Sequence, residues 1–236
     1  CAFEVAVWDR SRPGELVPTV DPVEEVGSAS RFAFRPLAAG LGGGSSDAAA
    51  VLRGLNALWG LGQPPERLAV VAAKVSSDAS FFIFAGTALA EGRGERVTPL
   101  PDASTSLLVL AVPPWQKQDK TARMYASLDE SDLSDGSRSQ RLVEALREGK
   151  NVDDDLICNA FQRAAYGNWP DLARYRDALL AGGARRVHLA GSGPALFAIA
   201  RSDEEVQAMA NSVRGLPGSV IVASTVAAST ASRLES

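Results

Sequence analysis

The stretch from Pro36 to Asp47 constrains this chain more than any other feature. It reads Pro-Leu-Ala-Ala-Gly-Leu-Gly-Gly-Gly-Ser-Ser-Asp, and an alanine-rich amphipathic run follows it at once. Glycines lack a Cβ atom, so the backbone can approach a ligand closely and turn its N–H groups toward it. The first N–H groups of a helix have no intrahelical acceptor and lie at the positive end of its dipole. The sequence therefore predicts a loop that opens a helix and binds a polyphosphate.

The run after the loop has the spacing of a helix with one buried face. Its apolar positions are Ala48, Val51, Leu52, Leu55 and Leu58. Ser45 or Ser46 is the expected N-cap, because a short hydroxyl side chain can accept from the first free N–H groups. Taken alone, a Gly-Ser loop is equally compatible with a flexible connector, so the remaining segments must decide between the two interpretations.

Composition excludes several classes of function. The 236 residues carry a net charge of −4, so there is no overall basic field for nucleic acid or for an anionic membrane. Two cysteines and a single histidine, His188, exclude Cys- or His-cluster metal sites. No apolar run approaches the roughly 20 residues that span a bilayer, and no signal peptide is visible. We expect a reduced, cytoplasmic protein, and the strand-like start without Met predicts that an N-terminal part is missing.

Strands and helices interleave along the chain, which predicts an α+β fold. A polar stretch near residue 103 predicts two domains, residues 1–102 and 103–236. Helices are predicted at 48–58, 64–74, 121–128, 138–148, 153–166, 170–181 and 204–213. Strands are predicted at 3–8, 31–35, 87–91, 95–100, 107–112, 185–190, 195–200 and 219–226.

Known phosphate and nucleophile motifs can be tested against the glycine loop letter by letter. A P-loop requires a Lys after its last glycine, and none is present. The dinucleotide fingerprint requires a glycine where this chain has Ser45. A nucleophile elbow requires glycines two positions to either side of the serine, and neither Ser45 nor Ser192 has them. These three interpretations are excluded.

The pattern that remains, Pro-x-x-x-Gly-Leu-Gly-Gly-Gly-Ser-Ser-Asp-Ala-Ala, resembles the ATP-binding motif of the GHMP kinase superfamily. Four further segments agree with it in order: 76–82, 88–95, 121–125 and 191–194. Together they most resemble the branch that phosphorylates a cytidine diphosphate-linked methylerythritol in isoprenoid biosynthesis. The resemblance implies a two-domain fold, with an N-terminal ribosomal-protein-S5-like α/β domain and a C-terminal ferredoxin-like α+β domain. It also implies ATP and Mg²⁺ as cofactors and a small-molecule substrate.

The resemblance also implies which residues form the site. The ATP phosphates would be bound by Pro36, Leu37, Ala38, Ala39, Gly40, Leu41, Gly42, Gly43, Gly44, Ser45 and Ser46. Gly191, Ser192 and Gly193 would close over them from the second domain. Asp78 matches the catalytic aspartate, which takes or orients the proton of the attacking hydroxyl. Without the family, Asp78 would be read as a turn residue and the glycines at 191 and 193 as a tight turn.

The chain departs from the family in ways that keep rival hypotheses open. A Lys-bearing first strand and the adenine-lining helix are not visible, and an acidic motif survives only as Asn159-Ala160-Phe161-Gln162. A non-catalytic remnant is one rival, and a homoserine- or mevalonate-type kinase is the other. Segment 88–95 argues against the latter. His188 is interpreted as structural. Lys117, Lys120 and Arg123 are interpreted as a solvated basic face. Metal ligands and oligomeric state are not predicted.

Overall fold

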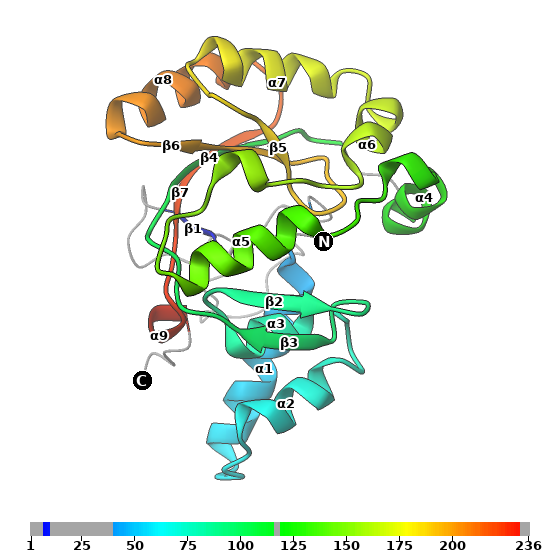
Figure 1. Cartoon of the computed structure of the whole chain (residues 1–236), viewed down its shortest axis with the longest axis vertical. Coiled ribbons are helices and arrows are strands. Elements are labelled where there is room, and N and C mark those ends of the chain that lie inside the picture. Colours follow the sequence, from blue (N-terminus) through cyan, green and yellow to red (C-terminus); the bar gives the residue numbers. More distant parts are fainter. Residues whose placement is uncertain (1–6, 10–39, 116–118, 232–236) are drawn as a thin grey trace, which may run out of the picture.

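The computed structural model describes residues 7–9, 40–115 and 119–231, with main chain alone for 7–9. The predictions for Pro36–Ala39, for the strand at 31–35 and for Lys117 lie outside this part. Within it the structure has helices and two antiparallel sheets, which confirms the α+β class (Figure 1).

The larger sheet has five strands in the order β1-β7-β4-β6-β5. They are β1 (Val7–Asp9), β4 (Leu107–Val112), β5 (His188–Leu189), β6 (Leu196–Ala200) and β7 (Ser219–Thr225). Every neighbouring pair is antiparallel. β4 is buried on both faces, since Val109 and Ala111 pack into one cluster while Leu108 and Leu110 pack into another. This alternation follows from the two-residue period of a strand.

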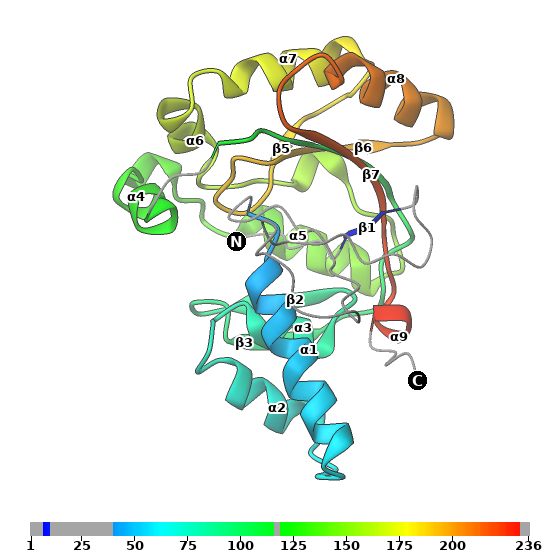
Figure 2. The same cartoon turned by 180° about the vertical axis from the view of Figure 1, so that it is seen from behind.

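Two helices cover one face of this sheet and a third lies on the opposite side. α7 (Leu172–Ala181) and α8 (Asp203–Val213) supply Leu172, Leu179 and Met209 to the main core. α5 (Ser137–Arg147) lies between the sheet and the small hairpin in both views (Figures 1 and 2). It buries Leu142 and Leu146 against Leu156.

The second group of elements lies beyond α5 and follows the glycine loop in sequence. It comprises α1 (Gly43–Leu58), α2 (Pro65–Ala72), α3 (Ala79–Phe84) and the hairpin of β2 (Ala88–Glu91) and β3 (Arg96–Pro99). Ala49, Ala72 and Phe82 join a separate core between these elements. Figure 2 shows α1 running from the sheet toward the far end of the molecule.

The remaining elements lie outside these two groups. They are α4 (Lys120–Ala126), α6 (Gln162–Asn168), α9 (Ala228–Ala231) and the 3₁₀ turns η1 (Glu130–Asp132) and η2 (Asp154–Leu156). The predicted helix at 153–166 is wrong over its first half, where only η2 forms. Asp153 and Asn159 each accept a backbone N–H two residues ahead, and such local bonds compete with a continuous helix. The predicted strand at 185–190 shortens to β5.

The other predicted helices, the hairpin strands, β4, β6 and β7 are confirmed, with ends shifted by a few residues. β1 covers the end of the predicted first strand and pairs with β7, a strand of the second predicted domain. The division at residues 1–102 and 103–236 therefore remains a prediction. Among the described residues, no helix is long and apolar enough to cross a membrane.

Candidate active site

The first glycine turn leads directly into α1. Gly42 has φ 65°, in the left-handed region that favours glycine, and its carbonyl accepts the Ser46 N–H at 2.9 Å. The helix therefore begins at Gly43, before either serine. The prediction that Ser45 or Ser46 caps the helix is wrong, because the conformational freedom of Gly42 lets the helix start earlier. The first N–H groups of α1 belong to glycines and Ser45, which suits a close approach by phosphate.

The two serines make different contacts. Ser46 Oγ donates to the Gly43 carbonyl at 2.9 Å. Ser45 Oγ lies 2.8 Å from Ser76 Oγ, a residue 31 positions further along the chain. This bond joins the glycine turn to the segment that carries Asp78.

Asp78 occupies the position before α3, but its side chain makes no capping bond to the helix. The side chain is exposed, and the hairpin passes close to it. A Cβ added to Gly94 would lie 3.2 Å from Asp78 Oδ1. Gly94 has φ 109°, so a larger residue at that position would meet both backbone strain and Asp78. The carboxylate is thus placed beside the hairpin tip with no structural bond of its own to the helix it precedes.

The second glycine turn, Gly191–Gly193, touches the first. A Cβ added to Gly40 would lie 2.2 Å from the Ala190 carbonyl oxygen, and one added to Gly191 would lie 2.8 Å from that of Gly40. Both glycines have positive φ, 85° and 50°. Contact this close requires glycine on both sides. The Gly193 N–H donates to the Ala190 carbonyl at 2.8 Å, so Gly193 shapes the turn.

Side chains from two other segments hold the second turn. Asn159 Nδ2 donates to the Leu189 carbonyl at 2.9 Å and to the Gly191 carbonyl at 2.7 Å. Lys120 Nζ donates to the Gly193 carbonyl at 2.5 Å. In the sequence, Asn159 stands out only as the remnant of an acidic motif. No local pattern predicts that its side chain binds the second glycine turn.

The prediction that Lys120 belongs to a solvated basic face is wrong. Only 8% of the residue is exposed, and burial lowers the pKa of its ammonium group to about 8. Arg123, on the same helix, is exposed as predicted. One turn of helix separates the two residues, and the partner of Lys120 in the second glycine turn lies 73 positions away, which the sequence does not reveal.

A cavity of about 920 Å³ opens between the two groups of elements. Asp78 and Gly94 line it from one side, and Tyr125, Asn159 and Phe161 from the other. Its size is in the range of small-molecule sites. The rings of Tyr125 and Phe161 meet edge to face, 5.0 Å apart, and Tyr125 is 62% exposed. An exposed ring in a cavity offers a stacking surface for a flat ligand group.

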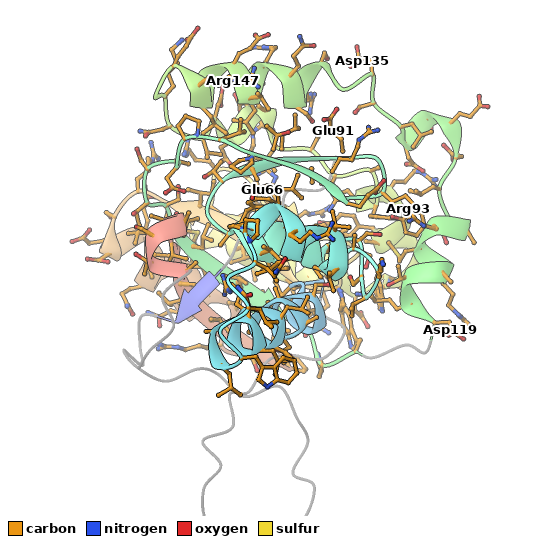
Figure 3. All side chains as sticks on the ribbon, turned by 90° about the horizontal axis from the view of Figure 1, so that it is seen from below. Glu66, Glu91, Arg93, Asp119, Asp135 and Arg147 are labelled. Carbon is orange, nitrogen blue, oxygen red and sulfur yellow. The ribbon has the colours of Figure 1, made fainter. Side chains whose placement is uncertain are left out.

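Charged side chains line part of the cavity. Glu91 and Arg93 come from the hairpin, and Arg147 comes from α5 (Figure 3). The backbone N–H groups of Glu95 itself and of Arg93 hold the pKa of the Glu95 carboxyl below its usual range, and Arg93 and Arg96 add favourable charge. The hairpin tip is therefore fixed around an ionised carboxylate, with arginines facing the cavity.

His188 has the surroundings of a structural histidine, as predicted. It is buried, and its Nε2 lies 2.6 Å from Asp154 Oδ1. Burial alone would raise the pKa of Asp154, but the His188 hydrogen bond and the nearby Arg185 and Arg186 outweigh it, and the pKa lies below its usual value. Among the described residues, no group of three or more His, Cys, Asp or Glu side chains could hold a metal ion.

Comparison with known families agrees with this architecture. The family model of the GHMP kinase N-terminal domain matches residues 28–86, and that of the GHMP kinase C-terminal domain matches residues 140–216. A crystal structure of 4-(cytidine 5'-diphospho)-2C-methyl-D-erythritol kinase superimposes with a TM-score of 0.67 at 30% identity, covering 82% of this chain and 68% of that one. The chain belongs to the GHMP kinase family, which confirms the resemblance drawn from its motifs.

Curated relatives carry the same enzyme name. The 4-diphosphocytidyl-2-C-methyl-D-erythritol kinase of Dehalococcoides mccartyi strain BAV1 is 47% identical over 165 residues, 70% of this chain and 58% of the relative. That of Geobacillus sp. strain WCH70 is 37% identical over 180 residues, 76% of this chain and 62% of the relative. This chain thus spans about three fifths of their length. A homoserine kinase from Cytophaga hutchinsonii shares the fold, with a TM-score of 0.65 at 20% identity.

Proposed function

We propose that the protein is an ATP-dependent kinase that phosphorylates the 2-hydroxyl of 4-diphosphocytidyl-2-C-methyl-D-erythritol, in the non-mevalonate route to isoprenoid precursors. One observation carries the proposal: two glycine turns from distant parts of the chain touch, and Asp78 is tied to the first through Ser76 and Ser45. The names of the relatives favour this acceptor over other alcohols. A cytoplasmic location belongs to the same proposal.

The two glycine turns fit the phosphates of ATP. Gly40 and Gly191 leave no room for a Cβ, and α1 begins with small residues whose N–H groups point out of the helix end. Backbone donors of this kind can hold phosphate oxygens without a large side chain. We assign phosphate binding to Gly40–Ser46 and to Gly191 and Ser192, with Gly193 closing the turn and Pro36–Ala39 extending the first loop.

Mg²⁺ is expected to arrive with the nucleotide, because the described residues lack a cluster of protein ligands for it. The oxygens near the phosphates are the hydroxyls of Ser45 and Ser46, which suit a hard cation. When bound, the ion neutralises charge on the phosphates. The described residues themselves position the nucleotide and the acceptor.

Asp78 is assigned the proton transfer. The acceptor hydroxyl oxygen forms a bond to the γ-phosphorus, the bond from that phosphorus to the ADP oxygen breaks, and the hydroxyl proton passes to the Asp78 carboxylate. The placement of Asp78 suits this role, since its side chain does not cap α3 and lines the cavity. Tyr125 and Phe161 offer an aromatic surface for the cytosine ring, and the arginines of the hairpin and α5 suit the diphosphate.

The test is a coupled assay of ADP release with the full-length protein. The cytidine-linked methylerythritol is compared with homoserine and mevalonate at equal concentration, and the product is checked for phosphate on the 2-hydroxyl. We expect turnover with the cytidine compound alone. Preference for homoserine or mevalonate would reassign the acceptor. ADP release no higher than the background without acceptor would favour a non-catalytic remnant.

A further inference from the structure

Lys120 is a charged side chain held where charge is costly. It starts α4, is 8% exposed, and its Nζ donates to the Gly193 carbonyl at 2.5 Å. Figures 1 and 2 both place α4 beside the turn that joins β5 and β6. Burial of an ammonium group costs stability, which raises the question of what purpose this position serves. The carbonyl that it contacts belongs to the proposed phosphate-binding turn, so the purpose is to be sought there.

The turn is held from a second direction by Asn159, which donates to the Leu189 and Gly191 carbonyls. In a trans peptide the carbonyl and the following N–H point in opposite directions. Fixing the Gly191 oxygen toward Asn159 therefore turns the Ser192 N–H away from Asn159. The residue after Gly193 is Pro194, which has no N–H. The peptide unit whose carbonyl accepts from Lys120 therefore has no N–H of its own.

The same two supports also reach the cavity. Helix α4 carries Tyr125, whose ring contacts Phe161, and the Phe161 N–H donates to Asn159 Oδ1 at 2.9 Å. Both Tyr125 and Asn159 line the cavity. The contacts form a closed circuit from Lys120 to the glycine turn, to Asn159, to Phe161 and back to α4. A ligand that orders Tyr125 would thus also order the turn.

We propose that Lys120 is a positioning residue, which fixes the Gly191–Gly193 turn for the nucleotide phosphates and couples that turn, through α4, to the acceptor bound beside Tyr125. The inference rests on the proposed function for the identity of the two ligands. Lys120 acts through the Gly193 carbonyl and not by touching the reacting atoms. Removal of the Lys120 side chain should therefore weaken nucleotide binding. It should also abolish the effect of the acceptor on nucleotide affinity.

The experiment measures the dissociation constant of AMPPNP with Mg²⁺ by calorimetry, using the full-length protein with and without saturating cytidine-linked acceptor. No phosphate is transferred from this analogue, so both ligands can be bound at once. The variants are Lys120→Met, which keeps the length but not the donor, and Lys120→Arg, which keeps a charged donor. Arg123→Met is the matched control, because it removes a positive charge from the exposed side of the same helix.

We expect Lys120→Met to raise the dissociation constant about tenfold, the value of one charged hydrogen bond, while Lys120→Arg stays within about threefold of wild type. Acceptor should tighten AMPPNP binding in wild type and in Arg123→Met but not in Lys120→Met. In steady-state assays the KM for ATP should rise more than kcat falls. Purely structural support would leave the acceptor effect intact. If Lys120→Met does not fold, Lys120→Leu, which also lacks a donor, carries the same expectation.

Unchanged AMPPNP affinity in Lys120→Met, or an equal loss in Arg123→Met, would overturn the inference. The inference and the proposed function fail separately. A wild-type protein that phosphorylates the cytidine substrate, with a Lys120→Met variant that binds AMPPNP normally, contradicts only the role of Lys120. A wild-type protein that transfers phosphate to another alcohol contradicts the acceptor assignment, while the loss of AMPPNP affinity is still measurable.

Discussion

The two glycine turns face each other but are built in different ways. The first, Gly40–Ser46, takes its shape from local sequence, since Gly42 adopts a left-handed conformation and α1 follows immediately. The second, Gly191–Gly193, is shaped by distant residues, with Lys120 and Asn159 bonded to its carbonyls. Substitutions within the first turn and substitutions at the distant residues that hold the second turn should therefore change the site in different ways.

The largest effect should come from a change that spares both turns. Asp78→Asn removes the proposed proton acceptor while keeping the size of the side chain, so kcat should fall by about 10²–10⁴-fold. AMPPNP affinity should change by less than about twofold, because the glycine turns are untouched. Stopped-flow ADP release and calorimetry on one preparation measure both. Turnover that survives within about threefold would remove Asp78 from the mechanism.

The contact between the turns is tested by Gly40→Ala. The new Cβ would lie 2.2 Å from the Ala190 carbonyl oxygen, at a residue with φ 85°. Left-handed strain and overpacking together should cost on the order of 3 kcal/mol in the free energy of unfolding, measured in urea. AMPPNP affinity should fall as well, since the turns must separate.

Gly44→Ala is the control in the same loop. No atom lies within 4 Å of a Cβ at Gly44, and its φ is not positive. Alanine in a helical position should leave stability equal or raise it by up to about 1 kcal/mol. Equal stability of the Gly40→Ala and Gly44→Ala variants would mean that the two turns do not touch in solution.

The smallest expected effect is a dependence of the free energy of unfolding on pH, which arises from Lys120 beside the second turn. The pKa of Lys120 is lowered from 10.5 to about 8 by burial, so the folded state loses this proton before the unfolded state does. Between about pH 8 and 10.5 the unfolded chain binds more protons, and this group makes the free energy of unfolding rise with pH. Below pH 8 its full cost is present.

Urea unfolding of wild type and Lys120→Met at pH 7.5 and 9.5 measures this contribution. The free energy of unfolding of wild type should rise relative to that of Lys120→Met as the pH increases from 7.5 to 9.5. The reason is that Met carries no charge to bury. The same comparison with Arg123→Met should show no such change. A constant difference across this range would mean that Lys120 is not buried as a cation.

The contrast between the turns also separates what the sequence predicts from what it does not. The glycine loop, the helix after it and most strands could be predicted, because they depend on glycine conformation and on apolar periodicity within short windows. The loop at Asn159 and the burial of Lys120 could not. Their partners lie 30–32 and 73 positions away, and only the folded sheet brings them together. Local turn bonds at Asp153 and Asn159 also explain the broken helix that periodicity favoured.

The candidate site follows the same division. The motif predicts Asp78 and the glycines of both turns as site residues, whereas the structure adds the contacts of Asn159 and Lys120 and the Ser45–Ser76 bond that joins the first turn to the segment carrying Asp78. In the proposed site, the motif residues are those that touch the ligand or let the backbone approach it. The residues that position them carry no fixed pattern, since any donor of suitable length can reach a carbonyl.

The central claim is that the two turns bind one nucleotide together, and hydrogen–deuterium exchange tests it most directly. The full-length protein is titrated with AMPPNP and Mg²⁺, and exchange is followed in peptides covering residues 40–46 and 190–194. The account predicts that both peptides gain protection with the same midpoint concentration. Protection of one peptide alone, or two clearly different midpoints, would contradict it.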